Sequence, residues 1–228
     1  MNIALVLSGG IGRRLASDVP KQYVTVNGKM IIIYTLQSLC AHEMIDAVHV
    51  VAARAWWEPM ITELPDASKL KGFSEPGENR QYSIINGLKD ISAYADESDV
   101  VLIQDGVRPC VSDDMISDVL NAVKGHDGAV PVLPLKDTVY LSEDGKKLSS
   151  TIRRSKLLAG QAPEAFVLGR YLAANNALKK EQLLELSGSA EPALLSGLDI
   201  VTVSGDEKNF KITTNGDLKR FIQLVSAQ

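Results

Sequence analysis

Glycine and arginine are concentrated in one short stretch that follows an apolar run at the start of the chain. The stretch reads Leu7-Ser8-Gly9-Gly10-Ile11-Gly12-Arg13-Arg14, and Lys21 lies a few residues beyond it. Glycines let the backbone turn tightly and approach a ligand closely. Backbone N–H groups and fixed positive charges at the end of a strand bind phosphate groups. These residue types predict a nucleotide site, and the simpler alternative is a glycine turn with solvated arginines.

Two common phosphate-binding motifs do not fit this stretch. Gly10-x-Gly12 begins like the dinucleotide fingerprint, but Leu15 stands where a third glycine is required. No Gly-Lys-Ser/Thr follows the glycines, so the P-loop is excluded as well. The remaining interpretation is a triphosphate-binding loop whose charge comes from the two arginines and Lys21.

An aspartate follows a second apolar run, in Gln104-Asp105-Gly106-Val107-Arg108-Pro109. Ligands of open α/β sheets bind outside the carboxyl ends of the strands, so Asp105 is expected to face the same cleft as the glycines. A single carboxylate beside a triphosphate is a usual way to hold Mg²⁺, which keeps several waters. The alternative is a turn aspartate that caps a loop.

Two further segments gain meaning only in combination with these. Pro76-Gly77-Glu78-Asn79-Arg80-Gln81-Tyr82-Ser83 is a glycine turn that opens a helix, and its arginine and serine could reach a base or a phosphate. Asn209-Phe210-Lys211-Ile212-Thr213 places a lysine on a short alternating segment. Taken alone, the first is a helix start and the second carries an ordinary surface lysine.

The elements that must position these residues alternate between apolar runs and amphipathic segments, which predicts parallel βαβ units in a doubly wound α/β sheet. The predicted strands are Ile3–Leu7, Ala47–Ala52, Leu70–Ser74, Val100–Gln104, Ala129–Leu133 and Ile200–Val203. The predicted helices are Met30–Cys40, Trp56–Leu64, Arg80–Ser92, a segment capped by Ser112, Leu168–Leu178, Glu181–Leu186, and Asp217–Val225 capped by Asn215.

One segment departs from this alternation. Residues 138–152 contain Asp144-Gly145, a hairpin turn signal, between flanks too polar for a pair of core strands. We interpret the segment as an exposed β-arm, and such an arm suggests contact with a partner subunit.

Size and composition limit the remaining possibilities. The chain has 228 residues, 45% of them hydrophobic, which predicts one sizeable domain over 1–228. Acidic residues outnumber basic ones by 28 to 24, a balance that argues against nucleic-acid binding. No apolar run approaches a membrane span, and two cysteines without metal or redox spacing favour a reducing cytoplasm.

Several short motifs, in order and over nearly the whole chain, resemble those of the polyol-phosphate cytidylyltransferases. That family includes the methylerythritol-phosphate enzymes of isoprenoid synthesis and the ribitol-phosphate enzymes of teichoic acid and capsule synthesis. The matching motifs are Ser8-Gly9-Gly10-x-Gly12-x-Arg14, Pro20-Lys21-Gln22, Arg80-x-x-Ser83, Asp105-Gly106-Val107-Arg108-Pro109, Asp137-Thr138, Arg154, Gln161-Ala162-Pro163 and Asn209-x-Lys211-Ile212-Thr213.

The resemblance implies a Rossmann-like nucleotidyltransferase fold, a homodimer formed through the arm, and a requirement for CTP and Mg²⁺. Carried over by position, it implies the following roles: catalysis by Arg14, Lys21 and Lys211; nucleotide binding by Leu7, Ser8, Gly9, Gly10, Gly12, Gly77, Arg80, Ser83 and Asp105; metal binding by Asp105; and acceptor binding by Arg108, Thr138 and Arg154.

The chemistry of CMP transfer suits these residue types. The nucleophile is a phosphate monoester with a second pKa near 6, so it is already largely dianionic at neutral pH. It attacks the α-phosphorus of CTP in line and pyrophosphate leaves. Such a transfer depends on positioning and on neutralising charge, which Lys21, Lys211 and Mg²⁺ supply. The chain therefore needs no dedicated base, and His42, His49, His126 and Cys110 are interpreted as structural.

Three departures from the family pattern bear on the acceptor. Ala162 stands where threonine is usual, Ser187-Gly188-Ser189-Ala190-Glu191 replaces a Thr-Asp-rich segment, and Gln104 stands where histidine is usual. Gly9-Gly10 and Val107 are closer to the ribitol-phosphate branch. The sequence thus favours ribitol 5-phosphate as acceptor, with methylerythritol phosphate as the alternative.

Two other functions stay open at this stage. A sugar-phosphate uridylyl- or adenylyltransferase would share the glycine-rich loop. A nucleotide-binding module without catalysis is suggested by Ala162 and the altered 187–191 segment.

Overall fold

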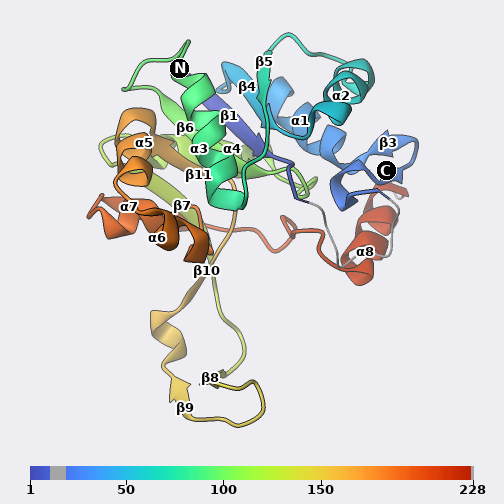
Figure 1. Cartoon of the computed structure of the whole chain (residues 1–228). Coiled ribbons are helices and arrows are strands. Elements are labelled where there is room, and N and C mark those ends of the chain that lie inside the picture. Colours follow the sequence, from blue (N-terminus) through green and yellow to red (C-terminus); the bar gives the residue numbers. More distant parts are fainter. Residues whose placement is uncertain (11–18, 227–228) are drawn as a thin grey trace.

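A central sheet of eight strands organises the chain, for which the computed structural model describes residues 1–10 and 19–226 (Figure 1). Seven strands follow the order β10-β7-β11-β6-β1-β4-β5, and β12 pairs with β7. The strands of this sheet are β1 (Asn2–Leu7), β4 (Ala47–Val51), β5 (Leu70–Ser74), β6 (Val100–Asp105), β7 (Gly128–Pro134), β10 (Leu158–Gly160), β11 (Glu164–Val167) and β12 (Ile200–Ser204).

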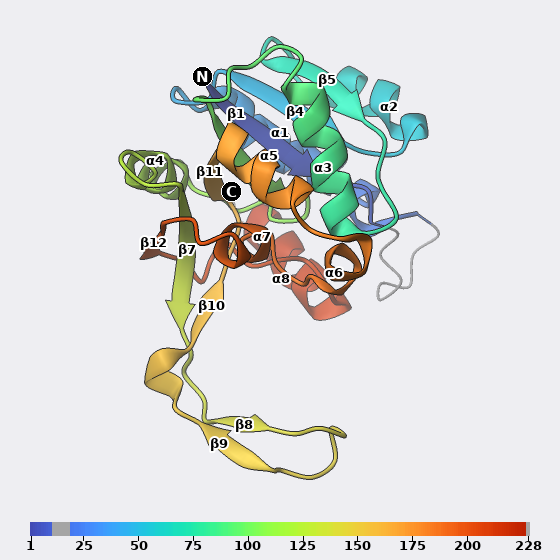
Figure 2. The same cartoon turned by 60° about the vertical axis from the view of Figure 1, so that its left-hand side comes forward.

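Helices cover both faces of the sheet (Figures 1 and 2). The α-helices are α1 (Ile31–Ala41), α2 (Trp57–Glu63), α3 (Arg80–Ile91), α4 (Asp113–Ala122), α5 (Leu168–Asn176), α6 (Lys180–Glu185), α7 (Glu191–Leu195) and α8 (Asn215–Ser226). Short 3₁₀ turns are η1 (Lys21–Tyr23), η2 (Arg54–Trp56) and η3 (Arg154–Lys156). Among the described helices, none combines the length and the apolar character needed to cross a bilayer.

Successive side chains of β1 point to opposite faces of the sheet, and helices pack against them on both faces. Ala4 and Val6 pack with α1 and α4 on one face, whereas Ile3 and Leu5 pack with α3 and α5 on the other. All four side chains are fully buried. A strand buried on both faces reads as an unbroken apolar run, which is why the sequence pattern located it.

Because β1 and β6 pair in parallel, the strands that precede the predicted site residues both end at the carboxyl edge of the sheet. β1 pairs with β6 and with β4, and the register sets Leu7 opposite both Asp105 and Val51. The segments that follow Leu7 and Asp105 therefore leave the sheet side by side. The predicted mostly parallel α/β sheet and all six of its predicted strands are confirmed, with ends that shift by one residue at most.

Two strands of the sheet were not predicted. β11 runs antiparallel between β6 and β7, and β10 runs antiparallel on the outer side of β7. A separate two-stranded hairpin, β2 (Thr25–Val26) and β3 (Lys29–Met30), was also missed, although Asn27 and Gly28 adopt the positive φ angles of 48° and 76° that its turn needs.

The predicted arm is present and extends away from the sheet as β8 (Val139–Leu141) and β9 (Ser150–Ile152), drawn in yellow in Figure 2. Its connection is wider than the predicted two-residue turn, because residues 142–149 form a loop. Asp144 stabilises this loop by accepting hydrogen bonds from the backbone N–H groups of Lys146 and Lys147.

One predicted helix cap is wrong. Asn215 is the first residue of α8 instead of its cap. The capping hydrogen bonds come from a reciprocal pair, in which Asp217 accepts from the Thr214 N–H at 2.8 Å and Thr214 Oγ1 accepts from the Asp217 N–H at 3.2 Å. The predicted cap Ser112 is confirmed, since its side chain accepts from the Met115 N–H.

Candidate active site

A cavity of about 420 Å³ lies at the carboxyl edge of the sheet and collects most of the predicted nucleotide site. Its lining consists of Leu7, Ser8, Gly9, Gly10, Lys21, Gln22, Gly77, Glu78, Asn79, Arg80, Ser83, Asp105, Val107, Lys211 and Thr213. We call it the nucleotide cavity. Two predicted residues, Gly12 and Arg14, lie outside the described residues, as does Arg13.

Hydrogen bonds from Gln22 hold the start of the glycine loop. Its side-chain amide donates to the carbonyl oxygens of Ser8 and Gly10, each at 2.7 Å. Gly9 lies against Pro76, and a Cβ at this position would come within 2.4 Å of the Pro76 side chain. Glycine is thus required at position 9 because the loop packs directly against the segment that leads into α3.

The entry to α3 is fixed by a compact set of hydrogen bonds. Asn79 caps the helix by accepting from the Tyr82 N–H, and Ser83 Oγ accepts from the Gly77 N–H at 3.0 Å. A Cβ on Gly77 would lie 2.3 Å from the Tyr82 Cβ, so the turn tolerates only glycine. This turn places Arg80 at the first position of α3, where it lines the cavity.

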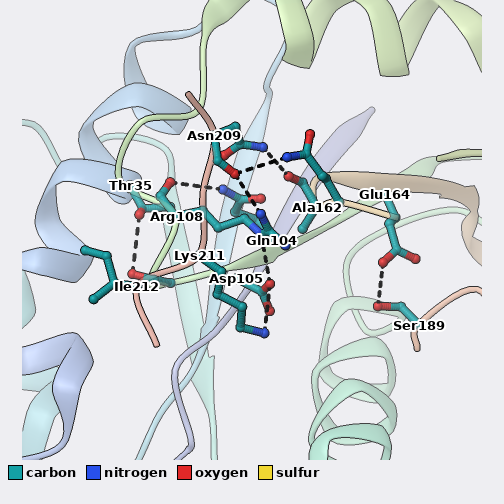
Figure 3. Close-up of polar contacts among 12 residues, drawn as sticks. Thr35, Gln104, Asp105, Arg108, Ala162, Glu164, Ser189, Asn209, Lys211 and Ile212 are labelled. Atoms are coloured by element: carbon teal, nitrogen blue, oxygen red, sulfur yellow. Dashed lines mark hydrogen bonds and ion pairs between the residues drawn. The ribbon is translucent and has the colours of Figure 1, made fainter. Parts of the chain in front are cut away.

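Three cationic side chains converge on Asp105 (Figure 3 shows Arg108 and Lys211). Arg80 Nη2 lies 3.2 Å from Oδ1, while Arg108 Nε and Lys211 Nζ each lie 3.1 Å from Oδ2. The carboxylate side chain is only 8% exposed. Burial alone would raise its pKa, but the three cations hold the pKa well below its usual range. Asp105 is therefore ionised and anchors a cationic cluster between distant parts of the chain.

The geometry around Asp105 tests its predicted role as a Mg²⁺ ligand. An ionised carboxylate is the oxygen donor that Mg²⁺ prefers. Both of its oxygens, however, already contact cations. No cluster of three or more metal-ligating side chains occurs among residues 1–10 and 19–226. The described residues thus offer the ion no set of three protein ligands, so phosphate oxygens and water would have to supply most of its ligands.

The two predicted catalytic lysines meet at one backbone segment. Lys21 Nζ donates to the carbonyl oxygen of Ile212 at 2.8 Å, next to Lys211. The Ile212 N–H in turn donates to the Val107 carbonyl at 2.9 Å. Asn209 fixes the other end of the segment by donating to the Ala162 carbonyl at 2.6 Å. The surface lysine expected from the sequence pattern is thereby held at the cavity.

A second cavity, of about 330 Å³, adjoins the first and shares Arg80, Asp105 and Lys211 with it. We call it the adjoining cavity. Its lining consists of Arg80, Asp105, Arg108, Val130, Gly160, Gln161, Ala162, Glu164, Ser187, Gly188, Ser189, Ala190, Glu191, Leu194 and Lys211. The predicted acceptor residue Arg108 lies here, and so do all the departures from the family pattern except Gln104.

Glu164, which no sequence motif indicated, lines the adjoining cavity from β11. Its Oε1 accepts a hydrogen bond from Ser189 Oγ at 3.2 Å, and Ser189 also accepts from Arg80. Burial raises the pKa of Glu164 to about 7. The one available signal was an acidic residue within an otherwise apolar tetrapeptide, Glu164-Ala165-Phe166-Val167.

Two predicted acceptor residues lie apart from both cavities. Thr138 is exposed on the arm and Arg154 is exposed in η3 beside it, where Arg154 donates to the Lys136 carbonyl. Neither lines the nucleotide cavity or the adjoining cavity of its own chain. The histidines and Cys110 are absent from both linings too, so the described site contains no alternative nucleophile among them.

Comparison with known proteins identifies what this site is similar to. The sequence profile of the IspD family, 2-C-methyl-D-erythritol 4-phosphate cytidylyltransferase, matches residues 2–225. A ribitol-5-phosphate cytidylyltransferase of Streptococcus agalactiae serotype III is 33% identical over 231 residues, covering 100% of this chain and 97% of that protein.

A second relative and a solved structure extend the comparison. The 2-C-methyl-D-erythritol 4-phosphate cytidylyltransferase of Geobacter metallireducens is 33% identical over 220 residues, covering 94% of this chain and 93% of that protein. The crystal structure of the Francisella tularensis enzyme named for the same activity superposes with a TM-score of 0.83 at 26% identity, covering 96% of this chain and 97% of that one.

Proposed function

The chain belongs to the IspD family of cytidylyltransferases, and we propose that it joins CMP to a polyol phosphate, with ribitol 5-phosphate as the preferred acceptor. As a member of this family it is a CTP-dependent nucleotidyltransferase with a Rossmann-like fold. The observation that carries the proposal is the cationic cluster on Asp105, which stands between two adjoining cavities.

The proposal assigns one substrate to each cavity. The triphosphate of CTP would lie along the glycine loop and Lys21, with the nucleoside near Gly77, Arg80 and Ser83. Backbone N–H groups at a glycine turn and at the start of α3 favour bound anions. The acceptor would occupy the adjoining cavity, with its phosphate at the edge shared with CTP.

The proposed reaction needs no proton transfer by a side chain. An oxygen of the acceptor phosphate forms a bond to the α-phosphorus of CTP, and the bond from that phosphorus to pyrophosphate breaks. Lys211 is placed to neutralise charge at the shared edge, since it lines both cavities. Lys21 supports the same step, and Arg14 is proposed to join them from the glycine loop.

Magnesium is proposed to accompany CTP. When bound, the ion would neutralise charge on the phosphates, chiefly ligated by phosphate oxygens and water, with Asp105 as the candidate protein ligand. The partners are otherwise small molecules, without nucleic acid or membrane, and the proposed location is the cytoplasm.

Relatives support each of the two candidate acceptors, ribitol 5-phosphate and methylerythritol phosphate. Two relatives named for ribitol 5-phosphate match the chain over its full length. One relative named for methylerythritol phosphate matches at the same identity over slightly fewer residues. Glycine at position 9, which packs against Pro76, and Val107 favour the ribitol branch. Product use would follow the acceptor, in teichoic acid or capsule synthesis for ribitol and in isoprenoid synthesis for methylerythritol.

The arm is proposed to form a homodimer of the single domain 1–228. Its two strands pair only with each other within the described chain, and a two-stranded ribbon is marginally stable alone. Tyr140 is 50% exposed and Leu148 is 67% exposed. In such a dimer Thr138 and Arg154 would reach the acceptor bound to the partner subunit.

The deciding experiment measures pyrophosphate release with CTP and Mg²⁺ over a panel of ribitol, methylerythritol, glycerol and arabinitol phosphates. We expect the highest kcat/KM with ribitol 5-phosphate, and weaker activity when UTP or ATP replaces CTP. Highest activity with methylerythritol phosphate would reassign the acceptor. Absence of turnover with every acceptor would refute the proposed acceptor class.

A further inference from the structure

The geometry points to Glu164 as a specificity-determining residue, whose carboxylate accepts hydrogen bonds from the hydroxyl groups of the acceptor. The inference rests on the proposed function, since it assumes that the adjoining cavity holds a polyol phosphate. It concerns the hydroxyl groups, whereas the proposed function concerns the phosphate.

Glu164 occupies a fixed position near the carboxyl end of β6, at the same end of the sheet as Asp105. It is the first residue of β11 and pairs with Ile103 of β6, two residues before Asp105. Its neighbours Ala165 and Phe166 are fully buried in the two cores of the sheet. A side chain on a paired strand between buried neighbours has little freedom, so its carboxylate is held in place before any ligand arrives.

One oxygen of this carboxylate has its hydrogen bond and the other has none. Oε1 accepts from Ser189 Oγ, whereas Oε2 is shielded from solvent and has no hydrogen-bond partner among the described residues. Buried polar atoms are nearly always hydrogen-bonded, and an orphan requires an explanation. The Glu164 side chain lines the adjoining cavity, and we infer that a donor group of a ligand bound there satisfies this oxygen.

The fold itself gains little from a charge at this position. No cation forms an ion pair with Glu164 within the described chain, because Arg80 and Arg108 are both committed to Asp105. Burial raises the pKa of the carboxyl to about 7. A glutamate that costs stability in the free protein and faces a ligand cavity is typical of a binding residue.

The charges of the adjoining cavity orient an acceptor in one direction. Arg80 and Lys211 line both cavities, Arg108 contacts Asp105 from within the adjoining cavity, and all three side chains attract a phosphate. Glu164 and Ser189 lie to the other side of Asp105 in Figure 3 and offer oxygen atoms. A carboxylate repels phosphate and accepts hydrogen bonds from hydroxyl groups. The polyol chain of the acceptor is therefore expected to extend toward Glu164.

The experiment compares two substitutions with a matched surface control. Glu164→Met removes both oxygen atoms at similar length, Glu164→Gln keeps one, and Glu185→Gln changes an exposed glutamate at the end of α6. With ribitol 5-phosphate, we expect Glu164→Met to raise the acceptor KM about tenfold or more, and Glu164→Gln to raise it less. The KM for CTP should stay within about twofold in all three variants.

Acceptors that lack one hydroxyl group separate binding from an indirect effect. A deoxyribitol 5-phosphate missing the contacted hydroxyl should lose about tenfold in kcat/KM with the wild type, but little further with Glu164→Met. Equal losses in both proteins for every deoxy position would overturn the inference, as would an unchanged acceptor KM in a folded Glu164→Met variant. A wild type inactive with all polyol phosphates would instead refute the proposed function.

Discussion

Asp105 holds three cationic side chains of the site together, beyond its predicted role as a metal ligand. The sequence predicted a single carboxylate for a metal ion, whereas the structure places it at the centre of three cations drawn from α3, from the loop after β6 and from the segment before α8. An arrangement of this kind fixes the direction of long, flexible side chains before substrates bind. Its catalytic value is preorganised positive charge where phosphates meet.

Glu164 gives the protein a predicted pH dependence of its own. Its pKa is raised to about 7 in the folded state from a model-peptide value near 4.5, so the folded state binds the proton more tightly than the unfolded chain. The sign follows directly. The stabilising contribution of protonated Glu164 to the free energy of unfolding is fully present below about pH 4.5, and it is lost as the pH rises through 7.

The variant Glu164→Gln should remove this dependence. In the ligand-free protein we expect it to raise the free energy of unfolding by about 1 to 3 kcal/mol at pH 8 relative to wild type, and to change it little at pH 4.5. Urea unfolding at the two pH values measures the difference. A stability change of equal size at both would contradict the ionisation argument, and Glu185→Gln serves as the control.

At the scale of elements, the parallel strands of the central sheet were predictable and its two antiparallel strands were not. β1, β4 and β6 are apolar runs whose signal lies within the strand itself. β11 is four residues long and follows Pro163, and its identity as a strand depends on pairing with β6 and β7, which are distant in sequence. Glu164 was missed for the same reason, because the sequence does not show which cavity this glutamate lines until the position of β11 in the sheet is known.

The residues of the candidate site also divide into those that could be predicted from the sequence and those that could not. The glycines and Asp105 could be grouped because parallel strands end at one edge, Lys21 because it closely follows the glycines, and Lys211 through the family resemblance. The nucleotide cavity brings together those of them that the structure describes. The contact of Ser189 with Arg80 and Glu164 joins the loop after α6 to the sheet. No periodicity in the sequence encodes that contact, because it arises from the packing of a loop.

Removal of the arm tests its proposed role as the dimer contact. Residues 134 and 158 are paired between β7 and β10, so the ends of the arm lie next to each other and a short Gly-Ser linker can join them. We expect deletion of Thr138–Ser150 to give a folded monomer, because it removes the exposed Tyr140 and Leu148, which are proposed to contact the partner subunit. Light scattering measures the mass, and circular dichroism checks the fold.

The result distinguishes two arrangements. A wild-type dimer that becomes a monomer of unchanged helix content supports the arm contact. A dimer that persists without residues 138–150 would place the interface on another surface, and a wild-type monomer would refute the dimer itself.

At the scale of the whole molecule, charge is distributed unevenly. The chain carries a formal charge of −4, yet positive groups gather where the two cavities meet. Thr138 and Arg154 line neither cavity of their own chain, and the arm extends away from the sheet in Figure 2. A complete acceptor site would then combine the sheet edge of one subunit with the arm of its partner.

Mixed dimers test that combination directly. Lys211→Ala disables the sheet edge and leaves the arm intact, whereas Arg154→Ala does the opposite. Each homodimer is expected to lose most of its activity, since a charge contact to a transferring phosphoryl group is commonly worth about 100-fold in rate.

Random co-assembly of the two variants produces heterodimers in which one of two sites has both an intact edge and an intact partner arm. Activity should therefore recover to roughly a quarter of wild type. Pyrophosphate release after co-expression of differently tagged chains measures the recovery, and a mixture of separately purified homodimers is the control. If each arm served the site of its own chain, every mixed dimer would lack a complete site and the activity would stay at the level of the control. Recovery to a quarter thus requires an active site that is shared between two subunits.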